Sequence, residues 1–260
     1  MRTGSLIAAI ALLLAPPAAR AVLPDEIQVY TDDINAPGAA GLELHVNTTP
    51  SGRRTPDFPN EVTPYHGLRV TPELSYGLTR TLEAGLYLPV TRDAEGRVLF
   101  AGPKARLKWM PLRPPEGGAG WFAGLNGEYA WLNDNFEKAT RTAELRPIVG
   151  WRDPRWLVSF NPMLDWALND ADRSARPDFA PSLKIARTVA DGLALGFEYY
   201  ADLGPLGRPV ARDQQSHALY AALEWERGPV PIHFAIGRGL TDATDKWTVK
   251  AIFAFAFGTR

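Results

Sequence analysis

The chain has 260 residues, of which 45 % are hydrophobic and 10 % aromatic, and its formal net charge is −1. This nearly neutral balance lacks the basic excess typical of nucleic-acid binders, so no nucleic acid is expected as a partner. The chain has no cysteine. That excludes a disulfide-stapled fold and a lipid anchor on cysteine, and leaves a large core or a closed hydrogen-bonded sheet to stabilise the protein.

The first residues have the pattern of a secretory signal peptide. Arg2 precedes an apolar run at residues 6–14, and the triplet Ala19-Arg20-Ala21 follows. We expect residues 1–21 to be removed as a signal peptide. Residues 22–38 are expected to form a periplasmic N-terminal segment, with one short strand at 27–30. No later stretch approaches the roughly 18 consecutive apolar residues of a transmembrane helix, so only strands are expected to cross a membrane.

Alternating hydrophobic and polar residues dominate residues 39–260. A period of two predicts strands with one hydrophobic face, and segments of this length, about ten residues, fit tilted transmembrane strands. We predict one domain, an all-β, closed antiparallel transmembrane β-barrel of about 12 strands, or 10 or 14 if one pair is merged or split. The predicted strands are 39–49, 67–78, 81–91, 98–110, 121–132, 141–151, 156–167, 178–189, 192–203, 215–226, 231–240 and 246–257.

The last of these segments shows the pattern most clearly. Phe253, Phe255 and Phe257 lie on one face, and Thr248 and Lys250 lie on the other. Because a charge at the bilayer midplane costs roughly 2–4 kcal/mol on the lipid face, the hydrophobic face is predicted to contact lipid. Tryptophans at or near predicted strand ends are typical of interfacial girdles. They are Trp109, Trp121, Trp131, Trp151, Trp156, Trp166, Trp225 and Trp247.

Prolines and connections refine this prediction. Proline lacks a backbone N–H, so prolines inside the predicted strands are expected to mark bulges or strand ends. They are Pro72, Pro89, Pro103, Pro147, Pro162 and Pro181. Short periplasmic turns alternate with longer outer loops in barrels of this class. The longest connection, residues 50–66, is expected to be an outer loop that folds over the mouth or into the lumen.

The polar faces of the predicted strands carry nearly equal numbers of acidic and basic residues. One interpretation is a network of ion pairs that fills a narrow barrel. The other is a polar path in which Lys104, Arg106 and Lys108 attract an anionic solute such as a carboxylate. The predicted pore-lining residues are Arg69, Glu73, Glu83, Lys104, Arg106, Lys108, Glu128, Glu144, Arg146, Asp165, Lys184, Glu198, Glu224 and Lys250.

The sequence offers little support for catalysis or for a bound cofactor. A hydrolase needs a nucleophilic serine beside a histidine, and no Gly-x-Ser-x-Gly motif is present. His45 and His233 become neighbours if the last strand closes onto the first, and two such histidines can bind a metal. We favour two isolated polar residues instead. We therefore predict no enzyme, no catalytic residue, no cofactor and no metal site.

Three stretches near the N-terminus resemble a known family. They are EIQVY at 26–30, GLELHVN at 41–47 and TPELSYGL at 71–78. They are similar to transporter-like outer-membrane β-barrels labelled with the meta-pathway of phenol degradation. The resemblance implies an outer-membrane channel for aromatic or other small organic compounds, with no catalytic residues to carry over.

Together these features predict a monomeric channel in the outer membrane of a Gram-negative cell envelope, for passive uptake or binding of small solutes that are aromatic or anionic. The expected partners are outer-membrane lipid, the solute, and the barrel-assembly machinery during biogenesis. Two alternatives remain open at this point. One is an outer-membrane barrel enzyme that acts on lipids, and the other is a soluble periplasmic β-sandwich that binds a ligand.

Overall fold

The computed structural model describes residues 26–169 and 175–257. The expected signal peptide, residues 1–21, lies outside the described residues. Within them, no helix has the length and apolar character needed to cross a bilayer.

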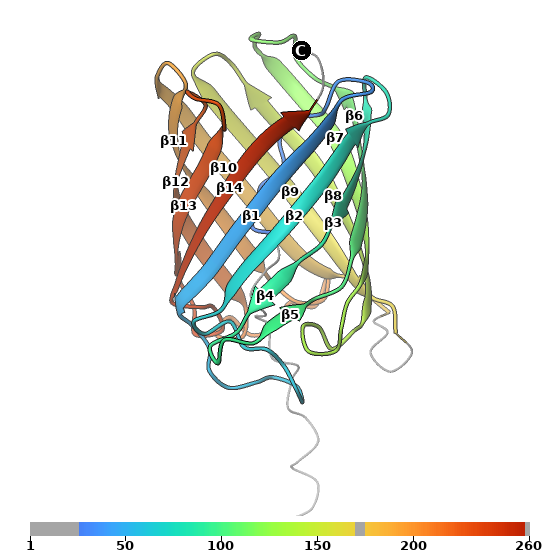
Figure 1. Ribbon diagram of the computed structural model, residues 1–260, viewed down its shortest axis with the longest axis vertical. Coiled ribbons are helices and arrows are strands. Elements are labelled where there is room, and N and C mark those ends of the chain that lie inside the picture. Colours follow the sequence, from blue (N-terminus) through green and yellow to red (C-terminus); the bar gives the residue numbers. More distant parts are fainter. Residues whose placement is uncertain (1–25, 170–174, 258–260) are drawn as a thin grey trace, which may run out of the picture.

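The described residues form one antiparallel sheet that closes on itself, because β1 pairs with both β2 and β14 (Figure 1). The predicted closed all-β barrel is therefore confirmed. The strands are β1 (Ala40–Ser51), β2 (Leu68–Gly77), β3 (Leu82–Tyr87), β4 (Val90–Arg92), β5 (Val98–Phe100), β6 (Lys104–Leu112), β7 (Gly120–Trp131), β8 (Arg141–Arg152), β9 (Trp156–Ala167), β10 (Asp178–Ala190), β11 (Leu193–Asp202), β12 (Ser216–Trp225), β13 (Ile232–Gly239) and β14 (Trp247–Phe257).

These strands span the height of the barrel wall twelve times, as predicted, and we call each passage a crossing. The strands β3 and β4 are one crossing interrupted at Pro89, and β5 and β6 are one crossing interrupted at Pro103. Backbone hydrogen bonds carry the wall across both interruptions: the Ala101 N–H donates to the Pro89 carbonyl at 2.9 Å, and the Trp131 N–H donates to the Pro103 carbonyl at 2.9 Å. Here the expected proline effect is confirmed.

The same expectation is wrong for the other four prolines, which lie inside uninterrupted strands. Pro72 pairs in register with Leu44, and Pro181 pairs in register with Pro162. Pro147 lies in a gap of the β8–β9 ladder, between pairs that share one register. The strands continue without a bulge because the residue pairs on either side hold one register, so each proline removes a backbone N–H donor from the ladder without shifting it.

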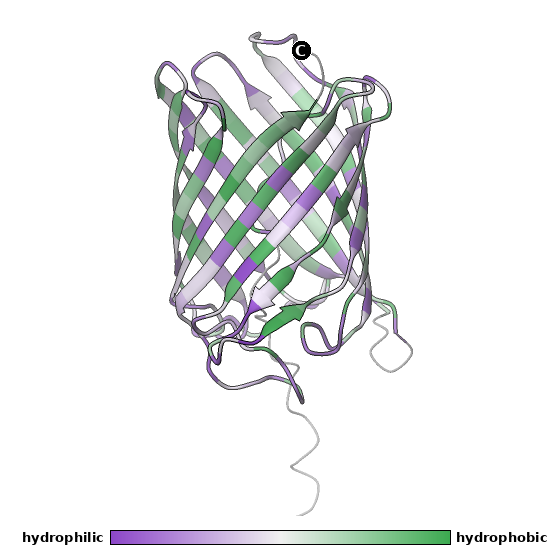
Figure 2. Cartoon of the chain, in the orientation of Figure 1, coloured by the Kyte–Doolittle hydropathy of each residue, from purple (hydrophilic) through white to green (hydrophobic). Residues whose placement is uncertain are grey.

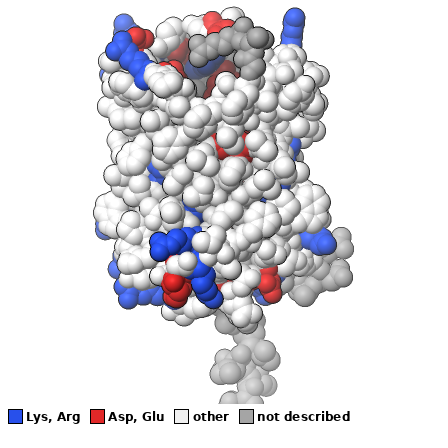
Figure 3. All heavy atoms as spheres, viewed as in Figure 1, with Lys and Arg blue, Asp and Glu red and all other residues white. Residues whose placement is uncertain are grey.

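The outer face of the barrel has the character of a lipid-facing surface. Hydrophobic and hydrophilic residues alternate along the strands in Figure 2, and large hydrophobic side chains such as Leu74 and Phe197 are exposed. On the face seen in Figure 3, most charged atoms gather towards the two ends and the middle is mostly uncharged. Six of the eight tryptophans are exposed near strand ends, as interfacial girdles require. They are Trp109, Trp121, Trp131, Trp156, Trp225 and Trp247.

Residues 26–37, which we call the luminal segment, depart from the sequence-based expectation. We expected this stretch on the periplasmic side with a strand at 27–30; its described part instead runs inside the barrel, and no strand forms at 27–30. The segment leaves the lumen at the end of the barrel that carries the short turns. There the Gly38 N–H donates to the Gly77 carbonyl at 2.8 Å, and the Gly77 N–H donates to the Ala39 carbonyl at 3.0 Å.

Candidate functional site

The candidate site is the lumen, which the wall and the luminal segment build together. All fourteen predicted inner residues face it, and most are buried, including Glu198 and Lys250 at 0 % exposure. Glu224 is the more open example, with a side chain that is 22 % exposed and lines a cavity. Their position on the inner wall follows from the strand alternation. Their role as the lining of a conducting path stays a prediction.

The charges on β2, β3 and β6 pair with one another. The Arg106 Nε donates to Glu73 at 2.7 Å, and the Arg106 Nη2 donates to Glu83 at 2.7 Å. Lys104 Nζ of β6 lies 2.9 Å from Glu128 of β7. On β8, the Arg146 Nε donates to Glu144 at 2.6 Å. Buried ion pairs of this kind stabilise the wall only as pairs, because a charge left without its partner is strongly destabilising.

A second group of charges surrounds Glu198 on β11. Its carboxylate accepts hydrogen bonds from Lys250 Nζ and, at 2.8 Å, from the Tyr200 hydroxyl. Lys184 Nζ lies 3.7 Å from Glu198 and is also paired with Glu224, and His233 Nε2 lies 3.1 Å from Glu198. This buried carboxylate is thus surrounded by groups that stabilise its negative charge.

The wall supplies hydrogen bonds that the luminal segment cannot make by itself. Three wall cations donate to its backbone carbonyls: Lys250 to Ile27 at 2.7 Å, Arg146 to Gln28 at 3.2 Å, and Lys108 to Asp33 at 2.7 Å. An extended segment outside a sheet has unmatched backbone groups, and buried groups of this kind need partners. The wall cations therefore fix the course of the segment through the lumen.

Tyr30 is the most extensively bonded residue of the segment. Its N–H donates to the Asn161 side-chain oxygen at 2.7 Å, and its carbonyl accepts a hydrogen bond from the Ser159 hydroxyl at 2.5 Å. Its hydroxyl lies 2.5 Å from the Tyr87 hydroxyl and donates to Glu128 at 3.1 Å. Both its backbone and its side chain are thereby anchored to the wall.

Apolar contacts fix the segment at two further points. Ile27 packs with Ala218, Tyr220 and Ala235 on β12 and β13. The ring of Tyr30 packs in a second cluster on the inner wall, with Ile34 beside it. The wall members of that cluster are Met110, Phe122 and Ile148.

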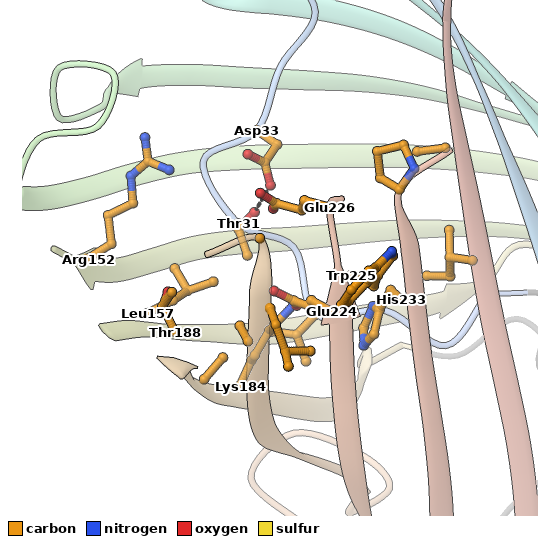
Figure 4. A pocket seen from close by; sticks show the side chains of 18 of the residues that line it. Thr31, Asp33, Arg152, Leu157, Lys184, Thr188, Glu224, Trp225, Glu226 and His233 are labelled. Atoms are coloured by element: carbon orange, nitrogen blue, oxygen red, sulfur yellow. Dashed lines mark hydrogen bonds and ion pairs between the residues drawn. The ribbon is translucent and has the colours of Figure 1, made fainter. Parts of the chain in front are cut away.

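Two of the cavities in the lumen meet at Gln28 of the luminal segment, and each lies towards a different end of the barrel. The turn-side cavity, about 320 Å³ in volume, opens towards the short turns. Figure 4 shows Thr31 and Asp33 from the luminal segment, and Lys184, Glu224 and His233 on the strands of the wall around this cavity. The loop-side cavity, about 380 Å³ in volume, lies towards the longer loops. Among the described residues, Gln28 is the one side chain that lines both cavities.

The first loop, residues 52–67, folds towards neighbouring loops at the loop end of the barrel. The Arg53 Nη1 donates to Glu61 at 2.9 Å, and the Arg53 N–H donates to the Asp245 carboxylate at 3.0 Å. Burial raises the pKa of Asp245 above its ordinary value, by more than the hydrogen bond and charge of Arg53 lower it. Val62 packs with Phe136 of the loop between β7 and β8, so the first loop covers part of the mouth.

One group of side chains has the composition of a metal site. Ligand atoms of Glu43, His45 and Glu73 lie within 4.8 Å of one another, and Glu43 lines the turn-side cavity. His45 Nε2 lies 3.0 Å from Glu73, whose other oxygen binds Arg106, so these groups also satisfy one another. The metal site weighed from the sequence paired His45 with His233 instead. Both flank Ile252 in register, but His233 pairs with Glu198.

Sequence reasoning missed the luminal segment as part of the site. The signal lay in large apolar side chains on wall faces that are otherwise polar, namely Phe122, Ile148 and Tyr220, which are at most 5 % exposed. The Glu43 contact with His45 and Glu73 needed only the register of the first hairpin, in which Glu43 lies opposite Glu73.

Comparisons with known proteins agree with this architecture. The sequence matches no protein-family model, and no curated protein matches it. The COG4313 outer membrane channel from Pseudomonas putida F1 has a TM-score of 0.63 and 12 % sequence identity, with 89 % of this chain and 100 % of that chain covered. The chain has the fold of outer-membrane channels.

Two porins have the same architecture. The NanC porin has a TM-score of 0.56 at 6 % identity, covering 84 % of this chain and 100 % of that one. The KdgM porin has a TM-score of 0.54 at 7 % identity, covering 84 % of this chain and 99 % of that one. The predicted likeness to outer-membrane barrels is confirmed at this level, and the narrower label of phenol degradation is not part of what these likenesses show.

Proposed function

We propose that the protein is a monomeric channel of the bacterial outer membrane through which small solutes pass, or in which they bind. The observation that carries this proposal is the pair of cavities that meet at Gln28 of the luminal segment, inside a closed wall with a lipid-facing exterior. Polar groups inside and hydrophobic groups outside are the arrangement that a solute path through lipid requires.

The volumes restrict the solute. Cavities of about 320 and 380 Å³ accept single small molecules and not folded chains. Phe136, Tyr200 and Tyr220 line the loop-side cavity, which supports a solute with an aromatic or apolar part, as the family resemblance implies. We include aromatic compounds in the proposal on this ground.

The three bases that suggested an anionic solute are engaged with other groups. Lys104 pairs with Glu128, Arg106 binds two carboxylates, and Lys108 donates to the Asp33 carbonyl. Their charges stabilise the wall and the luminal segment. The proposal therefore does not include attraction of anions by these residues.

An enzyme acting on lipids receives less support. A serine hydrolase needs a histidine bonded to the nucleophile. Of the four described histidines, His45 binds Glu73, His233 binds Glu198, His217 contacts Tyr199 and Gln215, and His66 stacks on Tyr65. A soluble β-sandwich is not the architecture found, since the sheet closes into one barrel.

The test is single-channel recording of the purified mature protein in a planar lipid bilayer. We expect discrete conductance steps. Heat-modifiable mobility on a gel serves as the control that the barrel is folded. A folded barrel that conducts no ions and hydrolyses a labelled lipid would overturn the proposal in favour of the enzyme.

A further inference from the structure

The two cavities share an excess of negative charge. Among the described residues, six carboxylates and three lysine or arginine side chains line each cavity. The equal ratio is notable because the cavities draw their residues from different ends of the barrel. A solute that crosses the lumen therefore meets the same sign of charge in both cavities.

Three of the basic residues in these cavities are paired with carboxylates. In the loop-side cavity, Arg146 binds Glu144 at 2.6 Å and lies 3.5 Å from Glu26. In the turn-side cavity, Arg152 lies 3.2 Å from Asp32, and Lys184 is paired with Glu224. The excess of negative charge consequently lies on carboxylates that outnumber the available bases.

Asp33 and Asp165 are the clearest members of this excess. Asp33, on the luminal segment, accepts a hydrogen bond from the Thr31 hydroxyl and makes no ion pair with the described residues. Asp165 lies opposite Glu144 in the β8–β9 register, so two carboxylates face the loop-side cavity side by side. Adjacent carboxylates attract protons or cations, because each disfavours the charge of the other.

The luminal segment adds to the excess of carboxylates in both cavities. The predicted inner residues of the wall are nearly balanced, whereas the described segment adds Glu26, Asp32 and Asp33 and no basic residue. The backbone carbonyls of the segment also occupy wall cations. Lys108, Arg146 and Lys250 donate to the carbonyls of Asp33, Gln28 and Ile27.

We propose that the passage selects for cations: inorganic cations and small organic solutes that carry an ammonium or a similar positive group. This inference rests on the proposed channel function and names its preferred solute class. Carboxylates within a low-dielectric wall raise the local concentration of cations and lower that of anions.

Gln28 lines both cavities, and we assign the narrow point of the path to it on this ground. Its Nε2 lies 3.4 Å from the Glu43 carboxylate, which lines the turn-side cavity. A cation that leaves the loop-side cavity, where Asp165 and Glu144 lie, thus passes Gln28 and meets Glu43 next. Carboxylates flank the shared residue on both sides.

The experiment measures the reversal potential of the full mature protein in a planar bilayer under a tenfold KCl gradient. We expect K⁺ to be at least about threefold more permeant than Cl⁻. Asp33→Asn and Asp165→Asn should each lower that ratio. Glu95→Gln is the matched control, because Glu95 lies on an outer loop with a side chain that is 71 % exposed, and it should leave the ratio unchanged.

The outcomes separate the two proposals. A conducting protein with equal or greater permeability to Cl⁻ overturns the cation preference and leaves the channel function standing. A folded protein that never conducts overturns the channel function and the preference with it. The sign of the reversal potential of the wild-type protein decides the preference even if a variant does not fold. A cation preference that neither aspartate variant reduces would overturn the assignment to these two carboxylates.

Discussion

The barrel wall and the luminal segment are held in place by different interactions. Each of the twelve crossings of the wall is stabilised by ladders with two neighbouring crossings, so its backbone groups are matched by other strands. The luminal segment has no ladder and depends on side chains that reach it from the wall, such as Lys250 and Asn161. We therefore infer that the segment depends on the wall for its course, whereas the sheet of the wall is held by its own ladders.

The largest expected effect comes from Lys250→Met, which acts on both regions. Lys250 is 0 % exposed and binds Glu198 on the wall and the Ile27 carbonyl on the segment. Its loss leaves a buried carboxylate without its nearest cation, and we expect unfolding in detergent to become easier by about 3–5 kcal/mol. Denaturant titration followed by gel mobility measures this. Lys246→Met, at an exposed loop position, is the control and should change little.

Gly77→Val should separate the two regions. A Cβ at Gly77 would lie 2.2 Å from the Ala36 carbonyl oxygen, so the luminal segment must move, at a cost of about 1–3 kcal/mol. We expect the segment to become sensitive to protease and the conductance to increase, while the wall stays folded. In the control Gly127→Val, the new Cβ has no neighbour within 4 Å. Equal protease resistance in both variants would show that the contact at Gly77 does not hold the segment.

Tyr30→Phe tests a single anchor of the segment. The change removes a hydroxyl that bonds with Tyr87 and Glu128 and leaves the apolar packing of the ring in place. We expect docking of the segment to weaken by about 1 kcal/mol, with faster hydrogen exchange at its amides and an unchanged wall. Tyr76→Phe removes a hydroxyl from an exposed ring on β2 and is the matched control. Exchange that is equally fast in both variants would contradict the anchoring role.

The smallest effect is expected for Gln28→Ala. The side chain lines both cavities and makes one long hydrogen bond, so its removal should affect stability little. We expect a conductance increase of roughly 1.5-fold in bilayer recordings, because a group between the cavities is removed. Thr188→Ala, which alters a side chain that lines only the turn-side cavity, is the comparison. If the two changes have the same effect, Gln28 is not the narrow point.

The same contrast explains what the sequence could predict. Every predicted strand end agrees with the structure to within two residues, because lipid on one side and a polar lumen on the other impose alternation along each strand. The interruptions at Pro89 and Pro103 were also predictable. The continuity of the sheet at Pro147 and Pro162 was not, since it depends on which prolines become neighbours across the ladder.

The position of the luminal segment could not be read from its own residues. Its contacts join positions far apart in the chain, and no periodic pattern records them. The inner-wall residues were accessible from alternation, but their partners depend on register: Glu43 opposite Glu73 and Glu144 opposite Asp165 follow only once the strands are aligned. The inner-wall residues of the site were thus predictable from the sequence, but the partner of each residue was not.

The bond between Lys250 and the Ile27 carbonyl joins residues separated by 223 positions, and Lys250 lies on the strand that closes the barrel. Its formation must wait until the end of the chain has been added to the sheet, since contacts of such separation form late. Docking of the N-terminal residues therefore reports completed assembly. A barrel that lacks its final strand would leave Ile27 without its bond to Lys250, and the start of the luminal segment would be open to proteolysis.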